Sequence, residues 1–165
     1  MKRINYILAT LLIVVVTVFT IASNEKPSEK ASYDYLDQTL TNAKTFTVEV
    51  LEEMPAENYT YKPGEEMRTF GEQAFHIAYS LEWFTARLNG EAIAWEPGDE
   101  SRMSKDELVT YTNEKFDSFI DTIKGLEEDG QITAGIMGVL RHNSHHRGQM
   151  VAYYRANGMA PPAYK

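Results

Sequence analysis

The fold is decided by the C-terminal stretch of the sequence. Residues 132–158 read ITAGIMGVLRHNSHHRGQMVAYYRANG. Apolar side chains recur along this stretch every three or four residues, which is the spacing of one face of an α-helix. Asn157 and Gly158 follow the last apolar residue, and an Asn-Gly pair typically ends a helix. The stretch therefore predicts a helix from about residue 132 to residue 156 with one face in a hydrophobic core.

The same periodicity predicts three further helices upstream. They cover residues 33–54, 69–90 and 104–125. Two of them open on capping boxes, in which Thr69 pairs with Glu72 and Ser104 pairs with Glu107. No alternating pattern typical of strands competes with this interpretation.

These four amphipathic segments predict an all-α fold, a four-helix bundle. The connections at residues 55–68 and 90–103 are long for simple up-and-down hairpins, so we expect at least one structured crossover. Because bundles place functional groups between facing helices, polar residues on the inward faces are the ones to examine.

An N-terminal hydrophobic helix is expected to precede the bundle. Lys2 and Arg3 come before an uncharged apolar run that ends near Ala22, a pattern typical of a cleaved signal peptide or a retained membrane anchor. Whether this segment is cleaved or retained, the positive charges before it predict that the following domain is exported, to the periplasm or another extracytoplasmic space. The expected division is a signal peptide or anchor at 1–23, a polar linker at 24–31 and the bundle domain at 32–165.

Composition narrows the classes of function. The chain has 16 Lys plus Arg against 24 Asp plus Glu, a net charge of −8, which disfavours a nucleic-acid partner. It has no cysteine, so disulfides, thiolate zinc sites and cysteine nucleophiles are excluded. Membrane contact is expected only through residues 1–23, if they are not removed.

The histidines are the main candidates for chemistry. His142 and His146 are four residues apart on one helical face, the spacing that two imidazoles need to hold one metal ion. His76 falls on the inward face of the second helix. Spacing alone leaves alternatives open: the pair could be a surface patch or hydrogen-bonded core residues, and His76 could be a satisfied core histidine.

Several motifs together are specific enough to suggest a family. The strongest are HNSHHRGQ at 142–149 and YRANGMAPP at 154–162, supported by YKP at 61–63, RTFGE at 68–72 and the pairing of His76 with a downstream Trp83. With them the chain resembles the DinB-like superfamily of metal-binding four-helix bundles, over nearly the whole length from Tyr33 onward.

The resemblance implies a site in which His76, His142 and His146 hold a divalent cation such as zinc or nickel. Three protein ligands leave a position for water or substrate, as in catalytic metal sites. Some relatives resemble thiol-dependent transferases or a maleylpyruvate isomerase, so the expected function is a metal-dependent hydrolase or thiol-type transferase acting on a small molecule. The alternative is a non-catalytic module that binds a metal or ligand. The resemblance also allows a homodimer, although no exposed heptad seam argues for one.

The helical positions of nearby residues relative to the three histidines indicate which of them could contact the site. Glu72 could orient an imidazole or act as a base, or serve only in its capping box. Gln149 could contact substrate or water, or hydrogen-bond between helices. We expect His145 to lie outside the ligand set, Arg147 to pair with surface carboxylates, and Gly148 to permit close helix packing.

Overall fold

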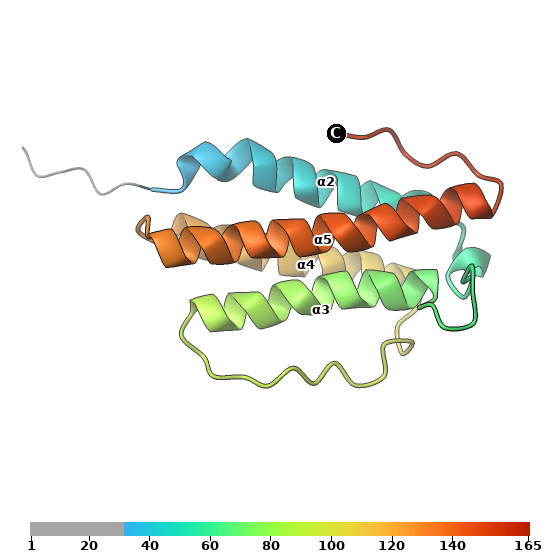
Figure 1. Ribbon diagram of the computed structural model, residues 1–165, viewed down its shortest axis with the longest axis horizontal. Helices are drawn as coiled ribbons and strands as arrows, with labels where there is room; N and C mark the ends of the chain where they lie inside the picture. The colour runs from blue at the N-terminus through green and yellow to red at the C-terminus, as the bar shows by residue number, and fades with distance from the viewer. Residues whose placement is uncertain (1–31) are drawn as a thin grey trace, which may run out of the picture. The chain divides into compact units, whose positions relative to one another are not determined.

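The computed structural model describes residues 32–165, and the predicted signal or anchor segment and the whole predicted linker lie outside them. Helices make up the architecture (Figure 1). They are the 3-10 helix η1 (Asp34–Leu36), α2 (Asp37–Glu53), the 3-10 helix η2 (Ala56–Asn58), α3 (Phe70–Leu88), α4 (Lys105–Lys124) and α5 (Gly130–Ala156). No strand forms between residues 32 and 165, which confirms the all-α fold. Within this range, none of the helices combines the length and the apolar character that crossing a membrane requires.

The helices begin where cap chemistry allows. The Thr69 hydroxyl accepts from the Glu72 backbone N–H at 3.2 Å, and the Glu72 carboxylate accepts from the Thr69 N–H at 2.6 Å, so the predicted capping box opens α3. The Asp129 carboxylate accepts from the N–H groups of Gln131 and Ile132 at 2.8 and 3.1 Å. This cap starts α5 at residue 130, two residues earlier than the apolar pattern predicted.

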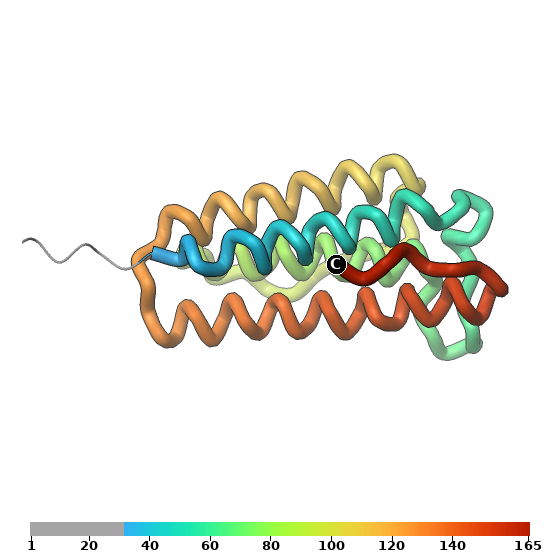
Figure 2. Tube along the Cα trace, turned by 90° about the horizontal axis from the view of Figure 1, so that it is seen from above, coloured from blue at the N-terminus to red at the C-terminus, as the bar shows by residue number. Residues whose placement is uncertain are grey.

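The four long helices run up, down, down and up. α3 packs against α4 and α5, and α2 packs against the same two helices from the other side. Figures 1 and 2 show that α3 and α5 run antiparallel, whereas α3 and α4 run parallel. Because parallel neighbours need a connection as long as the bundle, residues 89–104 return along α3 before α4 begins. This segment, which we call the crossover, is the structured connection expected from the sequence.

All four helices contribute to one hydrophobic core. Its fully buried members include Leu40, Val50, Phe70, Phe75, Leu81, Phe116, Phe119, Ile136, Val139, Met150 and Tyr153. Buried phenols satisfy their hydroxyls on backbone carbonyls: Tyr154 donates to Val50 at 2.7 Å and Tyr153 donates to Arg68 at 2.8 Å. These bonds fix α5 against α2 and against the start of α3. Residues 31–165 form one compact unit, and its described residues build a hydrophobic core of their own, so we expect this part of the chain to fold by itself.

Candidate metal centre

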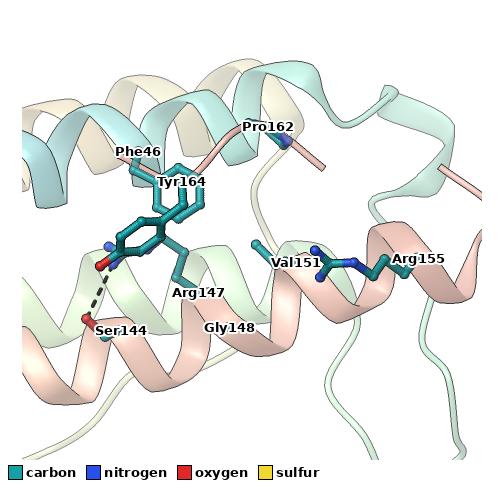
Figure 3. Close-up of a pocket in the computed structure, with 8 residues that line it drawn as sticks. All are labelled: Phe46, Ser144, Arg147, Gly148, Val151, Arg155, Pro162 and Tyr164. Carbon is teal, nitrogen blue, oxygen red and sulfur yellow. Dashed lines mark hydrogen bonds between the residues drawn. The ribbon is translucent and has the colours of Figure 1, made fainter. Parts of the chain in front are cut away.

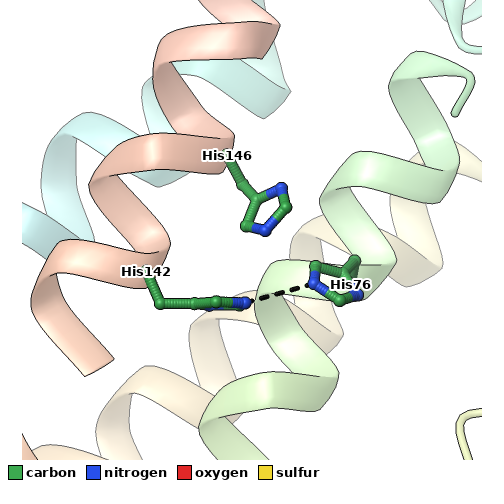
Figure 4. Close-up of side chains that lie close together, drawn as sticks. All are labelled: His76, His142 and His146. Atoms are coloured by element: carbon green, nitrogen blue, oxygen red, sulfur yellow. Dashed lines mark hydrogen bonds between the residues drawn. The ribbon is translucent and has the colours of Figure 1, made fainter. Parts of the chain in front are cut away.

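Three histidine rings converge between α3 and α5 (Figure 4). His76 comes from α3, and His142 and His146 come from successive turns of α5. The Nε2 atoms of His76 and His142 are 3.2 Å apart, and one ring nitrogen from each of the three lies within 4.8 Å of the others. A tetrahedral zinc ion about 2.0–2.1 Å from each nitrogen needs nitrogens about 3.4 Å apart. The His76–His142 pair is close to this spacing, and His146 completes a set whose ring nitrogens all lie within 4.8 Å of one another.

The remaining nitrogen of His146 is held by two glutamine side chains. Its Nδ1 lies 2.9 Å from the Gln73 Oε1 and 3.2 Å from the Gln149 Oε1. Both neighbours are carbonyl oxygens, so the proton of the neutral ring belongs on Nδ1. The Gln149 amide NH2 in turn donates to His145 Nε2 at 3.3 Å, which fixes the orientation of that amide.

His142 is oriented in the same way by Asn143. The His142 Nδ1 lies 3.2 Å from the Asn143 Oδ1, and the Ser80 hydroxyl donates to this same oxygen at 2.9 Å. Asn143 is buried, and its Nδ2 has no hydrogen-bond partner. A proton on Nδ1 of His142 leaves its Nε2 lone pair directed toward the other histidines.

Glu100, in the crossover, lies beside the third ring. Its carboxylate is 3.4 Å from His76 Nδ1 and forms an ion pair with Arg68. His76 Nδ1 is buried and has no hydrogen bond at this separation. Sequence reasoning missed Glu100, because the crossover has no helical phase that relates it to His76. The sequence shows Glu100 only as a carboxylate residue in a loop between two helices that begin with predicted capping boxes.

The three rings offer a divalent cation one lone pair each. With Nδ1 protonated on both His76 and His142, two acceptor lone pairs face each other across 3.2 Å. Moving one proton to Nε2 makes a hydrogen bond there; for His142 this leaves Nδ1 as an acceptor, which pairs with Asn143 only if the amide NH2 group faces the ring. A divalent cation removes the conflict by accepting all three lone pairs.

The electrostatics favour the neutral form of two of the rings, His76 and His146. Burial, and then the charges of the neighbouring histidines, lower the pKa of His146 to about 4. Burial also lowers the pKa of His76, followed by the charge of Arg68, while Glu100 opposes the shift. Neutral imidazole is the form that coordinates metals, so these two rings are ready to bind a cation at neutral pH.

Aromatic side chains cover one side of the rings. The ring of Trp95, in the crossover, meets His76 edge to face at 5.4 Å between centroids and contacts Tyr79 at 4.9 Å. The Trp83 indole N–H donates to the Ile93 carbonyl at 3.3 Å and holds the crossover against α3. Tyr79 and Trp83 thus support the segment that covers His76.

The other sequence-derived candidates are distributed differently. The Glu72 carboxylate is engaged in the capping box and makes no hydrogen bond to a histidine among the described residues. Its role as a base stays a prediction. Gln149 contacts His146, as described above, and His145 is exposed beside it.

Two expectations about α5 were wrong. Arg147 is buried and donates to Thr47, Ser144 and the Ala43 carbonyl, not to surface carboxylates, because its side chain points into the α2–α5 interface. Gly148 is exposed, and a Cβ there would meet nothing within 4 Å, so close packing does not require a glycine.

Comparisons with known proteins identify the fold and the family of the chain. The family model of the DinB superfamily matches residues 39–150, a range that contains all three histidines. A solved structure of a DinB-like protein from Bacillus cereus ATCC 10987 has the same fold, with a TM-score of 0.65 and 17% sequence identity, covering 82% of this chain and 99% of that one. No curated protein matches the sequence. Since the family model spans well over half of the sequence, the chain belongs to the DinB superfamily.

Proposed function

We propose that this protein is a metal-dependent hydrolase that acts on a small molecule at a centre formed by His76, His142 and His146. The observation that carries the proposal is the convergence of three ring nitrogens while each opposite nitrogen faces a side-chain oxygen. Such outer partners fix the tautomer and increase the basicity of metal-ligating histidines.

Donor chemistry supports a borderline cation. Three neutral imidazoles suit zinc or nickel, whereas magnesium and calcium prefer oxygen ligands. Three protein ligands leave room for water or substrate. A divalent ion bound there would supply a Lewis acid that polarises an oxygen and makes water a better nucleophile.

The chain's own residues would orient and shield this centre. Glu100 accepts the Nδ1 proton of His76 after a shift of a few tenths of an ångström from 3.4 Å. Gln73 and Gln149 hold His146. Trp95 excludes water from one side of His76 and offers an apolar surface to the substrate.

Hydrolysis is preferred over thiol transfer because of the proposed export. An N-terminal signal or anchor at residues 1–23 would place the bundle outside the cytoplasm, away from the cytoplasmic pools of low-molecular-weight thiols. Water, in contrast, is present in every compartment. The same centre can activate a thiol, so the experiment below includes one.

The test begins with metal content. Residues 32–165, the part of the chain expected to fold by itself, are purified, loaded with zinc or nickel, dialysed and analysed by elemental mass spectrometry. We expect one ion per chain, loss of the ion in His142→Ala, and retention in His145→Ala, a matched control from the same turn of α5. Absence of stoichiometric metal in the unaltered bundle contradicts the proposal.

Activity is then measured with p-nitrophenyl acetate, with and without added thiol. We expect metal-dependent turnover without the thiol, lost in His142→Ala and kept in His145→Ala. Turnover only with the thiol favours the transferase. Bound metal without turnover on a panel of activated esters favours the non-catalytic module.

A further inference from the structure

Arg147 is a buried cation without an acidic partner. Only 7% of the residue is exposed. Its Nη1 donates to the Thr47 hydroxyl at 3.0 Å and to the Ala43 carbonyl at 3.3 Å, and its Nη2 donates to the Ser144 hydroxyl at 3.3 Å. All of these acceptors are neutral, and no carboxylate pairs with Arg147 anywhere in residues 32–165. A buried charge is normally paired, because burial without a counter-ion is costly.

The guanidinium of Arg147 lines a cavity of about 280 Å3 between α2, α5 and the C-terminal tail (Figure 3). The same side chain lines an adjoining cavity of about 270 Å3, so the two form one groove. None of the three histidines of the metal centre lines either cavity. The groove is therefore separate from the proposed catalytic centre.

A second arginine extends along this groove. Arg155 is exposed on α5, and its guanidinium points toward Val151 in Figure 3. Its side chain makes no hydrogen bond or ion pair in the part of the chain that the structure describes. Glu49, the α2 carboxylate that meets the tail, is already paired with Lys165 at 2.8 Å. Two guanidiniums thus share one cavity, without acidic partners, in a chain of net charge −8.

Apart from the arginines and Ser144, the walls of the first cavity are apolar, whereas Thr39, Asn42 and Lys165 add polar groups to the adjoining one. Phe46 packs against the Arg147 guanidinium at 4.9 Å and against the Tyr164 ring at 5.3 Å, edge to face. Val151 and Pro162 complete the walls. Each of the two adjoining cavities is slightly smaller than a typical ligand pocket, which spans about 300–1,000 Å3, so the groove suits a small ligand.

We propose that this groove binds a small carboxylate that carries an apolar group. The planar guanidinium fork matches a carboxylate, and the aromatic and aliphatic walls match the apolar group. Binding would supply the counter-ion that Arg147 lacks and would exclude water from the Phe46–Tyr164 contact. A bare, strongly hydrated anion such as phosphate would leave the apolar walls unused.

The test uses benzoate as the probe and residues 32–165 in isothermal titration calorimetry. Benzamide, with the same shape and no charge, and inorganic phosphate are titrated in parallel. We expect saturable benzoate binding in the millimolar range or tighter, at least about tenfold stronger than benzamide binding, and weaker binding of phosphate. Equal binding of benzamide, stronger binding of phosphate, or no saturation with benzoate overturns the proposal.

Variants locate the site. We expect Arg147→Lys to weaken benzoate binding at least about tenfold, because lysine lacks the fork, and Arg155→Gln to weaken it about threefold to tenfold. Arg155 is exposed and makes no ion pair or side-chain hydrogen bond within residues 32–165, so its variant tests the site even if Arg147→Lys fails to fold. Arg141→Gln, the same charge change on an exposed part of α5 outside the groove, should bind normally. His142→Ala should also bind normally, and loss of binding in either control places the probe elsewhere.

Discussion

Acid should destabilise the metal-free bundle through His146. Its pKa is about 4 in the folded protein and 6.5 in its ordinary state. Above pH 6.5 the ring is neutral in both states and contributes no pH dependence. Between pH 6.5 and 4 the unfolded chain binds a proton that the folded site does not, so the free energy of unfolding falls as the pH falls.

The magnitude follows from these two pKa values. Between pH 7.5 and pH 5 the single proton lowers the unfolding free energy by about 2 kcal/mol. Because His146 is only partly buried and solvent screens its surroundings, about 1 kcal/mol is the firmer expectation. The lowered pKa of His76 adds a contribution of the same sign.

Urea unfolding of residues 32–165, treated with a chelator to remove metal, measures the free energy of unfolding at pH 7.5 and pH 5. His146→Gln should lose about 1 kcal/mol less than the unaltered bundle between these two values. His145→Gln, a change to the exposed neighbouring ring, should retain the full loss. Equal losses in His146→Gln and the unaltered bundle, or a diminished loss in His145→Gln, would refute the reasoning.

Three further predictions concern single side chains. Glu100→Gln should weaken zinc binding about 10- to 100-fold in competition with a chelator, because the partner of His76 loses its charge. The control variant Glu96→Gln, at an exposed carboxylate, should bind zinc normally. Equal zinc affinities of Glu100→Gln and the unaltered bundle would show that Glu100 does not support the centre. Thr69→Ala should lower the free energy of urea unfolding by about 1 kcal/mol through loss of the α3 cap, and an unchanged midpoint would contradict the importance of that cap. Phe116→Ala should lower the free energy of urea unfolding by about 3–5 kcal/mol, because the Phe116 ring is 1% exposed. A loss below 1 kcal/mol would show that the core collapses around the cavity.

The sequence predicted the helices well because their signals are local. The Thr69 capping box and the Asn157-Gly158 stop each involve residues a few positions apart, and the structure has the expected caps at both places. The start of α5 was placed two residues late, because apolar periodicity was followed and the Asp129 side chain was not considered as a cap.

The metal centre was predictable only in part. The i,i+4 spacing of His142 and His146 places both rings on one face of a helix, but nothing in the spacing locates His76 beside them. That position depends on how α3 packs against α5, and the family resemblance supplied it. Glu100 could not be found, because the path of an irregular segment depends on tertiary contacts such as those of Trp83 and Trp95.

The burial of Arg147 is a second feature that the sequence alone did not predict. A single arginine two positions from a glutamine and one from a histidine resembles any exposed basic residue on an amphipathic helix. Its burial follows from the register of α5 against α2, which places Thr47 and the Ala43 carbonyl opposite it. Register between distant helices leaves no mark in local sequence patterns.

The parallel orientation of α3 and α4 has a consequence for engineering. The segment that joins them contributes Trp95 and Glu100 to the surroundings of His76 but supplies none of the fully buried core side chains. Its length and sequence are therefore open to exchange while the scaffold that holds the three imidazoles stays intact. Libraries randomised between residues 91 and 99 would change which molecules reach the rings and leave the ligands themselves in place.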